Sequence, residues 1–399
     1  MEYRRFGRTE LQMPVFSTGG MRYQHQWQDL PMEEVSREGQ ANLEAIIRCS
    51  LELGINHIET ARGYGSSERQ LGQILPDLPR EQLIVQTKVS PESDVGRFRD
   101  NFHDSLARLN LDYVDLFAIH GINNEETLQW SLGPDGCLKA ARDFVKQGLA
   151  RHIGFSTHGS TDVIVRAIQA EEHGGFDYVN LHWFYIFQDN WPAVLEARKQ
   201  DMGVFIISPS DKGGMLYKPS DKLREITSPL HPIVFNDLFC LSFPEIHTLS
   251  IGVARPSDYD EHIEAVEQLD QAVELVPPIA ERMEGVMYET VGREFAERYA
   301  EGIPRWEEVP GGINIRIILW LYNLARAYDM VEYGRMRYNL LGNGGHWFPG
   351  FNMAKAVEEK ISLTPALAQS PFKDEIPRLL DEAHALLWSK PEKRLSESG

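Results

Sequence analysis

Short apolar runs rich in Val, Ile, Leu and Phe recur along the chain up to residue 252, and longer segments separate them. Runs of this length and composition predict β-strands. Their starts lie roughly 25 to 45 residues apart, which leaves room for a helix and two turns between neighbours. The eight runs are Met13–Ser17, Ile55–Thr60, Leu83–Lys88, Val114–His120, His152–Ser156, Tyr178–His182, Val204–Ser208 and Thr248–Gly252.

The segments between these runs carry apolar residues at the spacing of an amphipathic helix. Gly54 is typical of a helix end, and Ser67 with Gln70 fits the pattern of a capping box. The predicted helices are Glu33–Leu53, Glu68–Leu75, Arg97–Leu109, Leu138–Gln147, Thr161–Glu172, Trp191–Gln200 and Asp258–Val273.

Eight strands that are each followed by a helix predict an α/β fold of the (β/α)8 type, a TIM barrel. Residues 2–12 are expected to form a short hairpin ahead of the first strand. An open, doubly wound sheet is the alternative. It is disfavoured because no strand-to-helix turn carries the G-x-G-x-x-G phosphate loop.

The pattern changes near residue 280. Leu275–Pro278 (LVPP) is expected to break the preceding helix, and the chain beyond it has helical spacing, many Trp, Tyr and Arg residues, and no strand signals. The sequence therefore predicts a barrel at residues 1–278, a helical C-terminal domain at 279–390, and a polar, disordered tail at 391–399.

Composition narrows the range of partners. The chain has 399 residues, with 40 Lys and Arg against 59 Asp and Glu, so its formal net charge is −19. Nucleic acids and anionic membranes attract positively charged surfaces, so neither is expected as a partner. Hydrophobic residues at 42% and charged residues at 25% are typical of a folded protein with a sizeable core.

Cys49, Cys137 and Cys240 are the three cysteines, and they lie far apart in the sequence. Zinc, iron–sulfur and disulfide frameworks are therefore unsupported, and no metal is expected. The first residues lack the basic and apolar regions of a signal peptide, and the most apolar stretch, Ile313–Ala327, is too short to span a membrane. A cytoplasmic protein is expected.

The chemistry of a barrel lies where its strands end. The second predicted strand ends at Glu59, five residues before Tyr64; the third ends at Lys88 and the fourth at His120. A lysine beside a tyrosine favours the phenolate and lowers the pKa of the phenol, a carboxylate holds the lysine charged, and a histidine can orient a substrate oxygen. Each alone could be an ordinary rim or core residue; together they predict an acid catalyst.

The segments GINHIETARGYGSSE, IVQTK, LDYVDLFAIH and HIGFST resemble the signature segments of the aldo-keto reductases, which are NADPH-dependent barrel oxidoreductases. The resemblance covers about residues 2–270. It implies Tyr64 as the general acid, Lys88 as the neighbour that lowers its pKa, and His120 as the residue that orients the carbonyl. The fourth position of the family is normally Asp, and this chain has Glu59.

The same resemblance implies a set of NADP(H)-binding residues. They are Gly19, Gly20 and Met21 after the first strand, Ser156, Thr157 and Asn180 at the carboxamide, Ser208 and Pro209 in the loop that crosses the pyrophosphate, and Gly252, Arg255 and Glu261 in the adenine-ribose segment. Arg255 is expected to bind the 2′-phosphate, with an ordinary surface arginine as the alternative. Trp183 and Phe184 either wall the substrate pocket or pack beneath a loop.

These residues predict an oxidoreductase that reduces an aldehyde or ketone with NADPH. The substitution at Glu59 leaves open an NADPH-binding regulatory or scaffold module with weak or no turnover. A barrel hydrolase with Glu59 as base is the third reading, and it lacks a second carboxylate or a metal cluster on the other strand ends. The expected partners are a small-molecule carbonyl substrate and, for self-association, a second copy of the chain.

A second resemblance lies beyond residue 280. Some aldo-keto reductases carry a C-terminal ferredoxin-like domain with the run C-x-x-C-x-x-C-x-x-x-C-P, and this chain has Tyr299, Gly302, Arg305 and Val309 at the ligand positions. These residues cannot bind an iron–sulfur cluster. The resemblance implies a metal-free helical domain that covers the barrel or mediates self-association; an unrelated helical extension is the alternative. Its expected packing residues are Trp306, Trp320, Tyr322, Tyr328, Tyr338 and Trp347.

Overall fold

The computed structural model describes residues 1–23, 27–342 and 348–389. Contacts divide the chain into two compact units. The first contains the described residues of Met1–Gly213 and Asn236–Ala272, and the second contains Gly214–Phe235 together with the described residues from Val273 to 389. Within the described ranges, no helix combines the length and the apolar character needed to cross a membrane.

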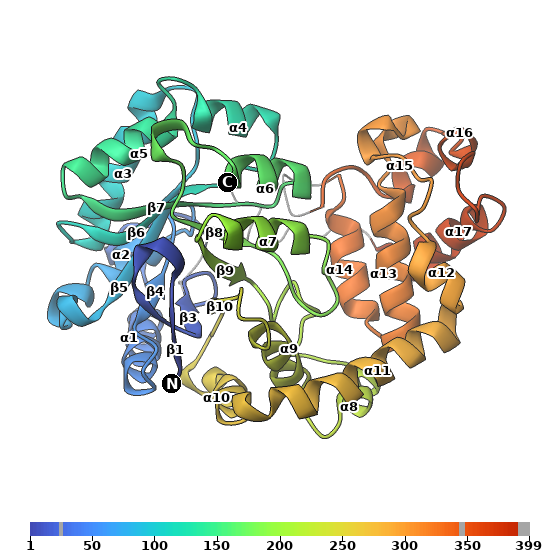
Figure 1. Ribbon diagram of the computed structural model, residues 1–399, viewed down its shortest axis with the longest axis horizontal. Coiled ribbons are helices and arrows are strands. Elements are labelled where there is room, and N and C mark those ends of the chain that lie inside the picture. The colour runs from blue at the N-terminus through green and yellow to red at the C-terminus, as the bar shows by residue number, and fades with distance from the viewer. Residues whose placement is uncertain (24–26, 343–347, 390–399) are drawn as a thin grey trace. The chain divides into compact units, whose positions relative to one another are not determined.

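The first unit is a closed barrel of eight parallel strands in the order β10-β3-β4-β5-β6-β7-β8-β9 (Figure 1). The predicted (β/α)8 barrel is thereby confirmed. Because the barrel closes, β10, its last strand in the sequence, pairs with β3, its first. The barrel strands are β3 (Phe16–Gly19), β4 (His57–Glu59), β5 (Ile84–Val89), β6 (Val114–His120), β7 (Ala150–Ser156), β8 (Tyr178–Leu181), β9 (Gly203–Ile207) and β10 (Thr248–Ile251).

Helices cover the outside of the barrel, and α3 (Val95–Leu109) shows how the sequence sets one. The Asp94 side chain caps its first turn by accepting a hydrogen bond from Gly96 N, and Asn110 ends it in the left-handed conformation. Its apolar face packs Phe102 on Phe117 of β6, with ring centroids 4.2 Å apart. The other helices are α1 (Arg37–Glu52), α2 (Ser67–Leu71), α4 (Glu125–Leu132), α5 (Cys137–Lys146), α6 (Thr161–Ile168), α7 (Trp191–Lys199), α9 (Pro232–Leu241) and α10 (Asp260–Glu267).

Two local predictions in the first unit are wrong. The run Met13–Ser17 is divided between two strands: Met13 belongs to β2 (Gln12–Pro14), which pairs with β1 (Tyr3–Arg5), and the barrel strand starts at Phe16. Both parts are apolar because both are buried. The capping box is also absent, since Ser66 is the N-cap of α2 and makes no side-chain cap bond, while the Ser67 hydroxyl contacts Thr60 Oγ1 at 2.7 Å.

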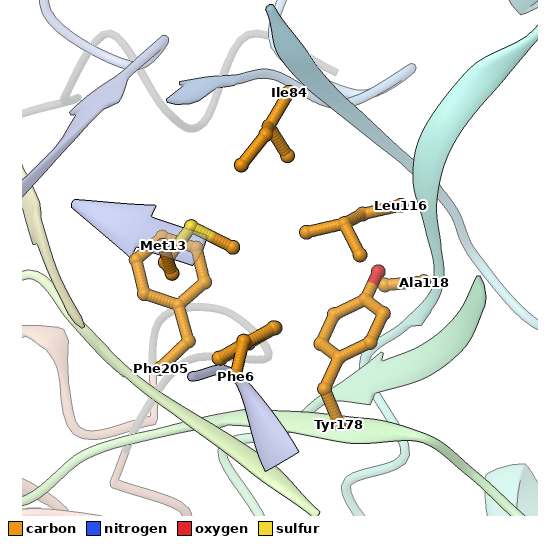
Figure 2. Close-up of a cluster of buried hydrophobic side chains, with 7 residues drawn as sticks. All are labelled: Phe6, Met13, Ile84, Leu116, Ala118, Tyr178 and Phe205. Atoms are coloured by element: carbon orange, nitrogen blue, oxygen red, sulfur yellow. The ribbon is translucent and has the colours of Figure 1, made fainter. Parts of the chain in front are cut away.

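The hairpin closes the barrel end at which the strands begin. Phe6 and Met13 point from the hairpin into the barrel and meet Ile84, Leu116, Tyr178 and Phe205 (Figure 2). Gly154 of β7 makes room for the Tyr178 ring, because an added Cβ would lie 2.5 Å from two ring atoms. This packed core leaves the opposite end, where the strands finish, for chemistry.

Gly154→Ala is expected to lower the free energy of unfolding by about 1–3 kcal/mol, because the methyl group would push into the buried Tyr178 ring. Urea unfolding followed by fluorescence measures the change. Gly63→Ala is the matched control, since nothing lies within 4 Å of its added Cβ. An unchanged urea midpoint in the Gly154 variant would contradict this account of the core.

The second unit is helical. The predicted helix break at Leu275–Pro278 is wrong, because α11 (Ala272–Val291) contains both Pro277 and Pro278. The two prolines and the residues four positions before them, Val273 and Glu274, are exposed, so water can satisfy the carbonyls that lose their hydrogen bonds. The other helices are α8 (Asp221–Thr227), α12 (Arg293–Arg298), α13 (Ile315–Tyr328), α14 (Val331–Leu340), α15 (Met353–Glu358), α16 (Thr364–Leu367) and α17 (Ile376–Leu387).

The expected aromatic residues of this unit differ in burial. Tyr322, Tyr328 and Tyr338 are buried, whereas Trp306 and Trp320 are half-buried. The Tyr338 hydroxyl contacts His384 Nδ1 at 2.7 Å and so connects α14 to α17. Trp347 and the predicted tail at 391–399 lie outside the described residues.

Candidate active site

Three of the predicted catalytic side chains meet at the barrel end where β4 and β5 finish. Glu59 and Lys88 are the last or next-to-last residues of their strands, and Tyr64 follows β4 in a short turn. Lys88 Nζ is in direct contact with Glu59 Oε1 and lies 3.3 Å from the Tyr64 hydroxyl. The Tyr64 hydroxyl lies 3.5 Å from the same Glu59 oxygen. A carboxylate, an ammonium and a phenol therefore share one point.

The Glu59–Lys88 pair is withdrawn from water, with exposed fractions of 2% and 1%. Lys88 also donates a hydrogen bond of 2.8 Å to the backbone oxygen of Thr60. Burial lowers the pKa of the Lys88 ammonium well below its ordinary value. A carboxylate in direct contact favours the charged form of a lysine, and Glu59 is so placed. A buried charge of this kind depends on its partner, so the pair acts as a unit.

The pKa of Tyr64 differs from the prediction. The sequence predicts that Lys88 lowers this pKa, but burial raises it above the ordinary value for a phenol, with a smaller contribution from Tyr23. The physical reason is that the loss of hydration outweighs the favourable effect of Lys88, whose charge is partly offset by Glu59 at contact distance. Tyr64 is therefore a protonated phenol throughout the physiological pH range.

His120 is the fourth predicted residue, and it stands edge-on to the Tyr64 ring, with centroids 5.6 Å apart and an angle of 84°. Burial lowers its pKa to about 3, and the positive charges of Lys88 and Lys212 add to the shift. The imidazole is therefore neutral near pH 7 and can donate one hydrogen bond without acting as an acid. Trp27 contacts the Tyr64 ring at 6.1 Å.

The predicted cofactor residues after β3 and β10 lie on the same barrel rim. Gly19 ends β3, next to Glu59 in the sheet register, and Gly20 and Met21 follow it. Gly252 follows β10, and its carbonyl accepts a hydrogen bond from Arg22. Arg255 is exposed and pairs with Asp258 at 3.0 Å, and Glu261 lies in the first turn of α10.

Ser156, Thr157 and Asn180, the three residues expected to bind the carboxamide, differ in their hydrogen bonds within the protein. Ser156 Oγ accepts a hydrogen bond from Gly121 N at 3.2 Å, and Thr157 Oγ1 donates to the Ile122 carbonyl at 2.7 Å. Asn180 is fully buried, and neither its amide oxygen nor its amide nitrogen has a partner among the described residues. An unpaired buried amide is costly, and a ligand that offers one donor and one acceptor can satisfy it.

The loop after β9 contains the last predicted pair. Ser208 adopts the left-handed backbone conformation, with φ of 56°, although it is not a glycine. Such strained positions cluster at functional sites. Pro209 follows, and its carbonyl accepts a 3.5 Å hydrogen bond from Asn236.

Three further groups on this rim were not predicted. His158 Nδ1 and His182 Nε2 lie 2.6 Å apart, and Lys212 Nζ lies 3.2 Å from His182 Nε2. His182 Nδ1 lies 3.2 Å from the Ile207 carbonyl, which can only accept, so Nδ1 carries the proton and Nε2 accepts. The sequence could have identified these residues, because they follow β7, β8 and β9 and so lie at strand ends on the same rim.

Trp183 does not face this rim. It is 1% exposed and packs against Trp191 and Phe239, with ring centroids 5.0 Å away in each case. Its role is therefore to pack beneath the neighbouring helices. Phe184 is also buried, 6.2 Å from the His182 ring.

A separate cavity of about 390 Å³ lies at the other end of the barrel, lined by Arg4, Arg5, Leu241, Ser242, Pro244 and His247. Arg4 donates hydrogen bonds there to the carbonyls of Leu241 and Ile246, at 2.9 and 2.7 Å. The cavity is a hollow between the hairpin and α9, and the strand-end rim remains the candidate active site.

Comparisons with known proteins identify relatives of this chain. Aldo-keto reductase AFTS1 of Alternaria alternata is 24% identical over 275 residues, which are 59% of this chain and 72% of that protein. L-glyceraldehyde 3-phosphate reductase of Escherichia coli (strain K12) is 26% identical over 174 residues, 40% of this chain and 46% of that protein. The chain thus spans less than half of the Escherichia coli relative.

A solved structure shares the fold. The aldo-keto reductase AKR11C1 from Bacillus halodurans superposes with a TM-score of 0.56 at 18% identity, over 70% of this chain and 97% of that structure. The family model for aldo/keto reductases matches residues 16–272, nearly the whole first unit. The chain belongs to the aldo/keto reductase family.

Proposed function

We propose that this protein reduces an aldehyde or ketone with NADPH. The observation that carries the proposal is the buried group of Glu59, Lys88 and Tyr64 with a neutral His120 at its side. A protonated phenol held by a charged pair suits a general acid, and a neutral imidazole suits a group that positions a carbonyl oxygen. The family supports the oxidoreductase class and, typically, NAD(P)H dependence.

The residues on the rim fit a nicotinamide nucleotide. The unpaired amide of Asn180 can exchange two hydrogen bonds with a carboxamide, which also has one acceptor and one donor side. Gly20 and Gly252 offer backbone without side chains at the ends of β3 and β10. Ser208, which with Pro209 begins the loop after β9, is proposed to contact the pyrophosphate, and Arg255 the 2′-phosphate. Ser156 and Thr157 fix the neighbouring loops through their own hydrogen bonds.

NADPH, when bound, supplies the hydride to the carbonyl carbon. This chain supplies the proton and the positioning. His120 donates its hydrogen bond to the carbonyl oxygen, and Tyr64 gives its hydroxyl proton to that oxygen as negative charge develops there. Lys88 stabilises the resulting phenolate, and Glu59 keeps Lys88 charged and in place.

The raised pKa of Tyr64 keeps the group protonated near neutral pH, which is the form that carbonyl reduction needs. Reduction needs the phenol as an acid, which is its form near pH 7, whereas oxidation of an alcohol needs the phenolate as a base. The proposal is therefore carbonyl reduction at neutral pH, with alcohol oxidation confined to alkaline pH.

Multiple-turnover oxidation of NADPH with a panel of simple aldehydes and ketones, followed at 340 nm, tests the proposal. Turnover supports the enzyme. Tight binding of NADPH without turnover on any carbonyl would favour the alternative, a regulatory or scaffold module that binds the nucleotide. That alternative remains because Glu59 stands where the family normally has Asp.

We propose that the C-terminal unit is a ferredoxin-like domain that has lost its cluster ligands. Its proposed role is the self-association of a cytoplasmic enzyme. The support is the sequence frame at Tyr299, Gly302, Arg305 and Val309, none of which supplies the thiolate or imidazole that an iron–sulfur cluster needs. In the described part of the chain, no three His, Cys, Asp or Glu side chains converge as metal ligands.

Arg255→Ala is expected to weaken NADPH binding by about tenfold and to leave NADH binding almost unchanged, because only NADPH carries a 2′-phosphate for the guanidinium. The Kd of each nucleotide, measured by quenching of protein fluorescence, checks this. Asp258→Asn, which removes the partner of Arg255 but keeps the guanidinium, is the control. Equal losses for both nucleotides would remove Arg255 from this role.

A further inference from the structure

We propose that Ser250 is a positioning residue that adapts this site to a glutamate at position 59. The proposal rests on the carbonyl reduction proposed above and names a residue that it did not use. Ser250 lies in β10, the last strand of the barrel, and is 191 positions from Glu59 in the sequence. Its hydroxyl is 3.3 Å from Glu59 Oε2.

The two oxygens of the Glu59 carboxylate have separate tasks. Oε1 faces Lys88 Nζ and the Tyr64 hydroxyl, whereas Oε2 faces Ser250. A carboxylate can only accept hydrogen bonds, so the serine hydroxyl is the donor. Glu59 is 2% exposed and Ser250 is 7% exposed, so water does not readily replace this donor. The hydrogen bond thereby fixes which oxygen is presented to Lys88 and Tyr64.

The barrel topology makes this contact depend on the strand between the two residues. The strand order is β10-β3-β4, and neighbouring strands lie about 4.8 Å apart, so the Glu59 side chain has to reach over β3 to meet β10. Gly19 is the β3 residue in register with Glu59. An added Cβ at Gly19 would lie 2.6 Å from Ser250 Oγ and 3.3 Å from Glu59 Oε2. The glycine leaves the space in which the serine and the carboxylate meet.

Side-chain length explains why the contact suits glutamate. Aspartate is shorter by one carbon–carbon bond, about 1.5 Å. An aspartate at position 59 whose carboxylate stays with Lys88 would leave the Ser250 hydroxyl beyond hydrogen-bond distance, because the present contact is already 3.3 Å. Ser250 should therefore matter when residue 59 is Glu and lose its influence when it is Asp.

A double-mutant cycle on the full chain tests the proposal. The parent, Ser250→Ala, Glu59→Asp and the double variant are compared for kcat and KM in NADPH oxidation with one carbonyl and for their urea midpoints. Ser250→Ala is expected to lower kcat about tenfold and to lower the urea midpoint, with KM for NADPH unchanged. In the Glu59→Asp background the same change should alter kcat less than about twofold.

Ser131→Ala is the matched control, because it removes a buried hydroxyl that bonds to the Thr127 carbonyl in α4. It should act on the urea midpoint equally in both backgrounds. If Ser250→Ala acts equally in both backgrounds, the proposal is overturned. Coupling in the urea midpoint alone, with kcat unaffected in an active parent, also overturns it, since Ser250 would then be purely structural.

Failure of the proposed function gives a different result. A parent that binds NADPH but turns over no carbonyl refutes the reductase, and the positioning role for that reaction with it. The urea cycle would still report whether Ser250 and Glu59 are coupled. The two failures are thus told apart by the parent's own activity.

Discussion

Tyr64→Phe is expected to lower the kcat for carbonyl reduction by at least about a hundredfold while NADPH still binds. The change removes only the hydroxyl, which lies 3.3 Å from Lys88 Nζ, and keeps the ring that contacts His120 and Trp27. Without that proton the alkoxide has no acid at the point where its charge develops. Steady-state oxidation of NADPH gives kcat, and fluorescence quenching gives the Kd of the nucleotide.

Tyr113→Phe is the matched control, because its hydroxyl accepts a hydrogen bond from Arg151 on the surface, away from the rim. It should leave kcat unchanged. A Tyr64→Phe variant that reduces carbonyls at close to the parent rate would show that another group supplies the proton, and the mechanism would be wrong.

Glu59→Gln is expected to have the second large effect, lowering the free energy of unfolding by about 3–5 kcal/mol and kcat by about a hundredfold or more. The reason is that Lys88 is 1% exposed and would keep its charge without a counterion, or lose the charge that stabilises the Tyr64 phenolate. Urea unfolding and steady-state kinetics measure the two effects.

Glu59→Asp is the control for charge, since it keeps the carboxylate and restores the residue that is usual in the family. It should stay within about tenfold of the parent kcat, because Lys88 remains paired. Equal activity of the Glu, Gln and Asp forms would instead make Glu59 an ordinary residue of the rim.

The strand pattern was sufficient to predict the barrel because each strand shows a distinct apolar run. Val114–His120 coincides with β6 to the residue. The pattern failed at Met13–Ser17, where one apolar run serves both the hairpin and the barrel, and at Leu275–Pro278, where exposed prolines sit within a helix. Periodicity reports burial, and it does not tell which of two buried strands a residue joins.

The candidate site could be predicted only in part for a related reason. Glu59, Tyr64, Lys88 and His120 carry chemistry that is recognisable at strand ends in the sequence. Ser250 is an ordinary strand serine until barrel closure brings β10 beside β3. The direction of the Tyr64 pKa shift could not be predicted from the sequence, because it depends on how deeply the hydroxyl is buried and how closely Glu59 contacts Lys88.

Barrel closure also sets the moment at which this site can exist during synthesis. Lys88 and Glu59 leave the ribosome long before Thr248–Ile251, and until that last strand is made, β3 and β9 are open edges with unpaired backbone groups. A nascent chain that ends before residue 248 therefore lacks the strand that pairs with both of these edges, and open edges can pair with wrong partners. Synthesis of β10 supplies the partner of both edges and, with Ser250, the donor that faces Glu59 Oε2.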